Sequence, residues 1–168
     1  MIDWVFVALP IAAVVHVFEE YVYPGGFAEA LSRLLPRATA LFTTKFHLVV
    51  NGLLIVLCLF SAFIGRANLV LSLSVFGLVF TNAVLHIRGA IVTKGYYPGV
   101  ISGVLIYLPL TLYAYFVFLS SQQISWLQAG FSFLLGVLYM GALMVYVLVQ
   151  QVDETSQQQP GERRKCNA

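Results

Sequence analysis

Charged residues are scarce in this chain. Its 168 residues include nine lysines and arginines and seven aspartates and glutamates, so 10% of the sequence is charged, whereas about 25% is usual in soluble domains. Hydrophobic residues make up 60%. A water-facing globule of this composition would lack polar surface, so an ordinary soluble domain is excluded and an integral membrane protein is indicated.

The shortage of basic residues and cysteines excludes two further classes. A net charge of +2 from scattered residues cannot form the basic stripe that nucleic acids require, so no nucleic-acid partner is expected. The two cysteines are Cys58, inside an apolar run, and Cys166, near the C-terminus. Their spacing fits neither a disulfide framework nor a zinc site made of cysteines.

Long apolar runs are what the sequence has instead. A helix needs about 20 mostly apolar residues to cross a bilayer, and five such runs occur, at 2–22, 40–64, 69–92, 98–119 and 126–149. After the first run, apolar residues recur at the spacing of a short interfacial amphipathic helix: Phe27, Ala30, Leu31, Leu34 and Leu35.

The predicted fold is therefore an all-α polytopic membrane bundle. Residues 1–150 form one domain of about five transmembrane helices plus the short interfacial helix. Residues 151–168 are polar and without an apolar face, so a disordered cytoplasmic tail is expected there.

The basic residues predict the orientation of the bundle. Only Arg66 lies in the link after the second run, and the other eight lie on the opposite side: Arg33, Arg37, Lys45, Arg88, Lys94, Arg163, Arg164 and Lys165. Because lysine and arginine accumulate in cytoplasmic loops, this distribution predicts an outside N-terminus and a cytoplasmic C-terminus.

Polar residues inside the apolar runs are costly and are candidates for function. They fall near the predicted cytoplasmic ends of the first three runs: His16, Glu19, Glu20, His47, Asn51, Asn82, His86 and Arg88. At 1.5 Å per residue, all three histidines of the chain lie roughly 9–11 Å from those ends. A polar cluster at one depth of the cytoplasmic leaflet is therefore predicted.

The string His16-Val17-Phe18-Glu19-Glu20 in the first run resembles the HXXEE family of bacterial membrane proteins, which is named for this motif. The resemblance covers residues 1 to about 150 and implies the inner membrane of a bacterium as the location. It directs attention to His16, Glu19 and Glu20, but it implies no reaction, so the chemistry must come from the residues.

The first hypothesis is a metal-dependent membrane enzyme. The predicted ligands of one zinc or iron ion are His16, His47, His86 and a carboxylate, Glu19 or alternatively Glu20. The other glutamate would be the general base, so Glu19, Glu20 and Arg88 are the candidate catalytic residues, Arg88 binding an anionic headgroup. Asn51 and Asn82 are expected to support the ligands. The role of Lys45, anchor or headgroup contact, stays open.

Two alternatives need no metal. One is an acid–base isomerase or cyclase, in which one of two adjacent carboxyl groups stays protonated and a histidine acts as base. The other is a small transporter or accessory subunit, because His and Glu chains also relay protons in membranes. The predicted depth favours a hydrophobic or lipid-like small molecule as substrate, and assembly into a homo-oligomer stays open.

Overall fold

The computed structural model describes residues 4–22, 26–34 and 44–158, and every regular element in these ranges is helical. The elements in chain order are α1 (Trp4–Val22), α2 (Gly26–Leu34), α3 (Thr44–Ile64), η2 (Gly65–Asn68), α4 (Leu69–Thr93), α5 (Val100–Ser102), η3 (Gly103–Tyr107), α6 (Leu108–Ser120) and α7 (Trp126–Gln158). The predicted all-α bundle is confirmed.

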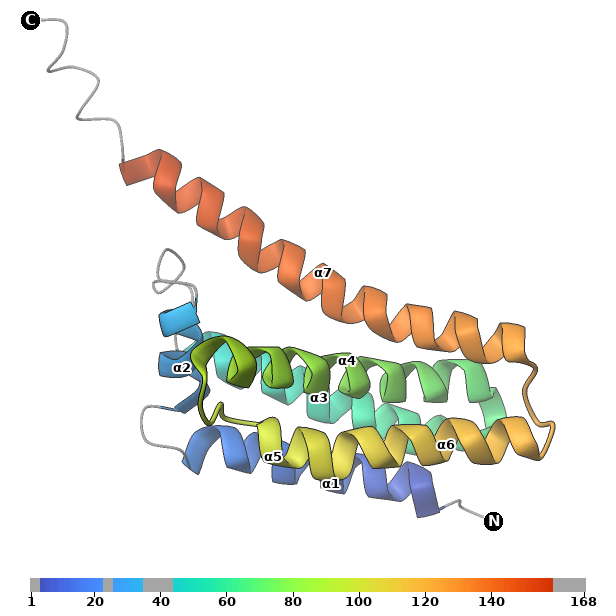
Figure 1. Cartoon of the computed structure of the whole chain (residues 1–168). Coiled ribbons are helices and arrows are strands. Elements are labelled where there is room, and N and C mark those ends of the chain that lie inside the picture. Colours follow the sequence, from blue (N-terminus) through green and yellow to red (C-terminus); the bar gives the residue numbers. More distant parts are fainter. Residues whose placement is uncertain (1–3, 23–25, 35–43, 159–168) are drawn as a thin grey trace, which may run out of the picture.

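Four helical stretches of the described residues are long and apolar enough to cross a membrane: Trp4–Val22, Lys45–Thr93, Val100–Ser120 and Trp126–Tyr146. The second has 49 residues because it contains two helices. Figure 1 shows α3 and α4 running side by side as a hairpin, joined by the short η2 turn. The four stretches of the described residues therefore supply five membrane-crossing helices, as the sequence predicts, and these indicate a membrane protein.

The sharp turn between α3 and α4 is built by two residues. Gly65 has a φ of +48°, in the left-handed region that glycine enters without a Cβ clash. Asn68 caps α4, since its side chain accepts a hydrogen bond from the backbone N–H of Leu71 at 3.1 Å. The hairpin thus reverses the chain within the four residues of η2.

A different helix form interrupts the stretch from Val100 to Ser120. Gly103–Tyr107 is a π-helical turn between α5 and α6. A π-turn contains one residue more than an α-turn and changes which side chains face a neighbouring helix. Here the ring of Tyr107, which is fully buried, lies 4.5 Å from the ring of His16 on α1, centroid to centroid.

Helix α7 packs against α4 through small residues. A Cβ on Gly136 would collide with backbone atoms of Ser74, Gly77 and Leu78, and a Cβ on Gly77 would lie 3.0 Å from the carbonyl oxygen of Phe133. Such close backbone approach is how helices associate inside membranes, where packing replaces the hydrophobic driving force. Towards its C-terminal end, α7 diverges from α3 and α4 (Figure 1).

The structure locates the ends of α7 and of the amphipathic helix. Helix α7 continues to Gln158, beyond the predicted start of a disordered tail at 151, because a helix already nucleated in the membrane extends readily into glutamine and glutamate, which are good helix formers. The amphipathic helix begins at Gly26 and ends at Leu34. Leu35 and the predicted start of the second run at residue 40 lie outside the described residues.

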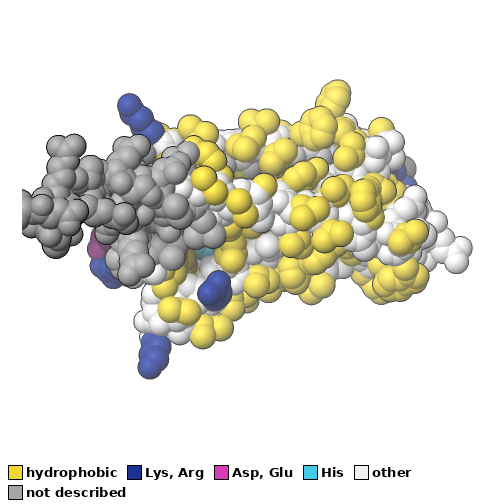
Figure 2. Space-filling model, turned by 90° about the horizontal axis from the view of Figure 1, so that it is seen from above, with side chains coloured by type: hydrophobic (Ala, Val, Ile, Leu, Met, Phe, Trp, Pro, Cys, Tyr) yellow, Lys and Arg dark blue, Asp and Glu magenta, His cyan; other side chains and the backbone are white. Residues whose placement is uncertain are grey.

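The basic residues lie mainly at one end of the bundle. Among the described residues, Arg33 is on α2, Lys45 is in the first turn of α3, and Arg88 and Lys94 are at the end of α4, whereas Arg66 lies in η2 at the opposite end. Figure 2 shows this face covered with hydrophobic side chains and most of its basic side chains gathered towards one end. This end also carries α2.

Replacement of Gly136 by Ala should weaken the packing of α7 on α4. The added Cβ has no room between the two backbones, so the free energy of unfolding should fall by about 1–3 kcal/mol. Gly130→Ala is the matched control, because nothing lies within 4 Å of a Cβ at that position of the same helix. Unfolding of both variants in mixed micelles measures the difference. If the two variants are equally stable, the contact between α4 and α7 is not tightly packed.

Candidate functional site

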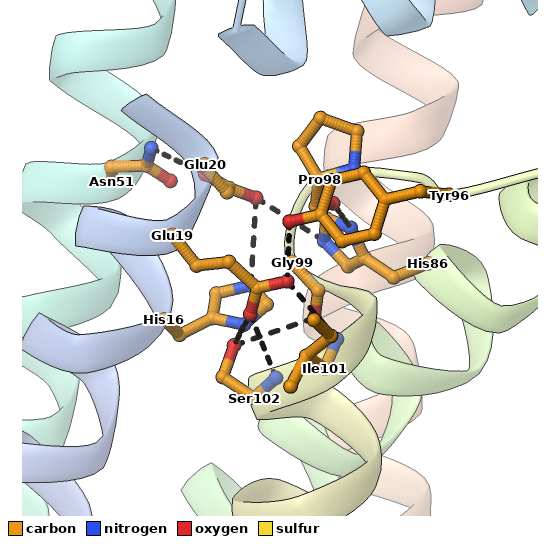
Figure 3. Close-up of polar contacts among 10 residues, drawn as sticks. All are labelled: His16, Glu19, Glu20, Asn51, His86, Tyr96, Pro98, Gly99, Ile101 and Ser102. Atoms are coloured by element: carbon orange, nitrogen blue, oxygen red, sulfur yellow. Dashed lines mark hydrogen bonds and ion pairs between the residues drawn. The ribbon is translucent and has the colours of Figure 1, made fainter. Parts of the chain in front are cut away.

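Three buried side chains converge between α1 and α4. Nε2 of His16 lies 3.4 Å from Oε1 of Glu20, one helical turn away on α1, and Nε2 of His86 on α4 lies 3.2 Å from the same oxygen. His16, Glu20 and His86 are 0%, 3% and 2% exposed. The three donor atoms lie within 4.8 Å of one another, so the group can hold a metal ion (Figure 3).

The far nitrogen of His16 is fixed by a hydrogen-bonded chain. Oγ of Ser102 donates to Oε2 of Glu19 at 2.5 Å, so its lone pairs are left to accept from Nδ1 of His16 at 2.8 Å. Nδ1 of His16 therefore carries a proton, and in the neutral ring Nε2 turns a lone pair towards Glu20.

The far nitrogen of His86 is fixed in the same way. Nδ1 lies 2.5 Å from the carbonyl oxygen of Pro98, which can only accept, so the proton is again on Nδ1. Both imidazoles consequently present Nε2 to Glu20. Histidines that bind metals characteristically donate their other N–H to a carbonyl or carboxylate partner in this manner.

Glu20 is held by a third helix. Its second oxygen, Oε2, accepts a hydrogen bond of 2.8 Å from Nδ2 of Asn51 on α3. Because this contact occupies Oε2, the other oxygen faces the two histidines. Asn51 therefore lies next to the carboxylate, which is the kind of supporting position that the sequence suggests for it.

Glu19 has a different surrounding from Glu20. Its carboxylate accepts hydrogen bonds from the hydroxyl of Tyr96 at 2.8 Å, from the N–H of Ile101 at 3.0 Å and from the N–H of Ser102 at 2.7 Å, besides the Ser102 hydroxyl. The sequence favours Glu19 as the metal ligand, but Glu20 stands between the imidazoles. Glu19 instead caps the first turn of the Val100–Ser120 stretch, where Gly99 has no side chain to do so.

The segment before α5 closes tightly over both histidines. Gly99 has a φ of +85°, and a Cβ there would lie 2.7 Å from the ring of His86 and 2.8 Å from that of His16. Pro98, Gly99 and Ser102 are not among the site residues expected from the sequence. A Pro-Gly pair just before an apolar run, with serine three residues later, is the signal that points to them.

The remaining predicted residues surround a cavity of about 560 Å³ beside the group. His47 lines it, with its ring against Phe27 and Phe46 at centroid distances of 5.5 and 5.6 Å, and it is not in the group of three. Asn82 and Arg88 also line the cavity, and Arg88 is exposed. Lys45 is exposed and is not part of the lining.

The cavity lies between α3, α4 and α7, with α2 at one end. Glu20 and His86 contribute its polar wall, and most other lining residues are apolar, among them Leu54, Leu57 and Met140. Tyr97 lies at this end, 3% exposed, with its ring on Gly89. Burial, and next the negative charge of Glu20, raises the pKa of Tyr97, so its phenol stays protonated at neutral pH.

A family model described as "Protein of unknown function with HXXEE motif" matches residues 7–114, which is more than half of the chain. The chain belongs to the HXXEE family. No curated protein and no solved structure matches it.

The histidine and the two glutamates of the HXXEE motif have different contacts in the structure. The histidine and the second glutamate are four residues apart, so His16 and Glu20 share a helix face and meet His86. The first glutamate, Glu19, is turned by about 100° on the helix and meets the backbone of the Val100–Ser120 stretch. Ser102 joins the two faces, since it contacts both Glu19 and His16.

Substitution of Gly99 by Ala should disturb this arrangement. The new Cβ would collide with both imidazole rings, and a residue other than glycine is strained at this φ, so the free energy of unfolding should fall by about 1–3 kcal/mol. Gly95→Ala is the control in the same loop, because its Cβ would meet only the carbonyl oxygen of Thr93 at 3.9 Å. Thermal unfolding in detergent checks the difference, and a Gly99→Ala protein as stable as Gly95→Ala would contradict the packing.

Proposed function

We propose that this protein is a membrane-embedded, metal-dependent enzyme that acts on a lipid or isoprenoid, with one zinc or ferrous ion held by His16, Glu20 and His86. The separation of the donor atoms carries the proposal. Tetrahedral ligands at the usual zinc distance of about 2.0–2.1 Å lie about 3.3 Å apart. The two Nε2 atoms lie 3.4 and 3.2 Å from Oε1 of Glu20, and all three donor atoms lie within 4.8 Å of one another.

The chemistry of the three donors also fits a divalent cation. In their neutral form both imidazoles turn a lone pair inward, because their Nδ1 atoms donate elsewhere. Three electron-rich atoms that face one another in a buried space favour a cation between them. Two imidazoles and one carboxylate are the ligand set of several hydrolytic zinc sites and of non-haem iron sites.

A site with three protein ligands leaves coordination positions for a substrate, which distinguishes catalytic from structural zinc sites. A divalent ion held there would act as a Lewis acid towards an oxygen of the substrate. The protein's own contribution is orientation: Asn51 holds Glu20, Pro98 holds His86, and Ser102 holds His16. Glu19 secures Ser102 and thereby the ring of His16.

The surroundings of the group support a hydrophobic substrate. The adjoining cavity of about 560 Å³ is within the usual range of ligand pockets and is mostly apolar. Its lining includes Tyr139 and Met144 of α7, the helix that diverges from α3 and α4 towards its C-terminal end (Figure 1), so a molecule dissolved in the membrane would enter beside α7. A reactive bond close to a headgroup would meet Glu20 and His86.

The metal content of the purified protein tests this proposal. Wild type produced in zinc- and iron-supplied medium should contain near-stoichiometric metal, and His16→Ala, Glu20→Gln and His86→Ala should each lose it, because two remaining ligands bind too weakly to survive purification. His47→Ala should keep the metal, since His47 lines the same cavity outside the group. Arg33→Ala, exposed on α2, should keep it as well.

The opposite results are equally informative. If metal-free wild type stays folded and converts a lipid, the metal hypothesis is wrong and acid–base catalysis takes its place. Glu20 and His86, 3.2 Å apart, would then share a proton. Loss of metal from His47→Ala but not from His16→Ala would show that the ligands differ from those proposed.

We also propose that the end bearing the group faces the cytoplasm, because the basic residues of the described ranges lie mainly there. In a background with Cys58 and Cys166 replaced, Arg66→Cys should react with a membrane-impermeant maleimide in intact cells. Lys94→Cys should react only after permeabilisation. The reverse pattern would invert the orientation.

A further inference from the structure

The cavity beside the group extends along two helices. Its lining residues on α4 extend from Leu78 to Val92 and those on α3 from Phe46 to Leu57. At 1.5 Å per residue these stretches measure roughly 21 and 16 Å along the helices. An extended hydrocarbon chain can lie lengthwise along such a lining.

Polar groups follow one another along α4 in this cavity. Arg88 is exposed at the basic end, His86 of the metal-binding group comes next, and Asn82 lies one turn, roughly 6 Å, further in. Beyond Asn82 the lining is mostly apolar, with Leu78 on α4 and Leu54 on α3, and includes Tyr139 on α7. The cavity lining thus has a cation at the basic end, Glu20 and His86 next to it, and mainly apolar residues at the other end.

The amide oxygen of Asn82 has an unused hydrogen-bonding capacity. Its Oδ1 atom is buried and accepts no hydrogen bond within the described part of the chain. A buried acceptor left unpaired costs about 1–3 kcal/mol, so a donor that satisfies this oxygen adds to affinity. A hydroxyl suits either end of the amide, because a hydroxyl can both donate and accept.

We propose that this cavity binds a phosphate-bearing lipid with a free hydroxyl close to its headgroup. The phosphate would pair with Arg88, the hydroxyl would bond to Asn82, and one hydrocarbon chain would extend towards Leu54 and Leu78. Such a lipid would be the substrate class of the proposed enzyme, and its turnover, unlike its binding, rests on the function proposed above. Binding itself needs no metal, so the two proposals can fail separately.

The experiment measures lipid binding to chelator-treated protein in detergent micelles by native mass spectrometry. The probes are palmitoyl lysophosphatidate and palmitoyl propanediol phosphate, which differ only in the free hydroxyl. Wild type should bind the hydroxylated probe about tenfold more tightly, as expected for one hydrogen bond to a buried amide. Asn82→Leu should bind both probes equally, and its affinity for palmitoyl propanediol phosphate should equal that of wild type. This retained binding also shows that the variant is folded.

Two further variants test the headgroup contact. Arg88→Gln should weaken both probes by about tenfold, whereas Lys94→Gln, exposed at the same end and not lining the cavity, should leave both unchanged. Equal binding of the two probes by wild type, or a preference that survives in Asn82→Leu, would overturn the proposal. Equal weakening by Arg88→Gln and Lys94→Gln would do the same. If Asn82→Leu binds neither probe, Asn82→Ala decides between these outcomes in its place.

Discussion

Two consecutive carboxylates inside an apolar helix impose the main constraint on this structure. A charged group in a low-dielectric interior is tolerated only when it is paired or hydrogen-bonded. Glu19 and Glu20 point in different directions from α1, so each needs partners from a different part of the chain. Glu20 contacts Asn51 of α3 and His86 of α4. Glu19 accepts hydrogen bonds from Tyr96, Ile101 and Ser102. The pair thus ties the first helix to the next three apolar stretches.

Composition and spacing predict a large part of this arrangement. The five apolar runs give the helices because bilayer thickness fixes their length. The shared depth of the histidines anticipates that His16 and His86 meet, since residues at one depth on neighbouring helices of a bundle lie close together. That inference needs only helix rise and chain order.

The division of labour between Glu19 and Glu20 could not be predicted in this way. The two residues are adjacent, both lie one turn from His16, and the sequence does not state which helix packs on which side of α1. Ser102 and Pro98 act through a hydroxyl and a carbonyl whose directions depend on the left-handed Gly99, so their roles emerge only from coordinates. His47 illustrates the same limit, because its depth is right but its ring lies against Phe27 and Phe46.

The π-helical turn at Gly103–Tyr107 accommodates one additional residue in the Val100–Ser120 stretch. It separates Ser102, which meets α1 through Glu19 and His16, from the helix α6, whose Thr111 bonds to the carbonyl oxygen of Phe76 on α4 at 3.1 Å. Because the wider turn contains the additional residue, the two flanking parts keep nearly the relative rotation of a continuous α-helix that is one residue shorter. A residue gained or lost in the regular α-helical parts would instead rotate everything beyond it by about 100°, and Ser102 and Thr111 could then no longer both keep their partners. Related sequences that preserve this architecture should therefore place a one-residue length difference between these two positions at the π-helical turn.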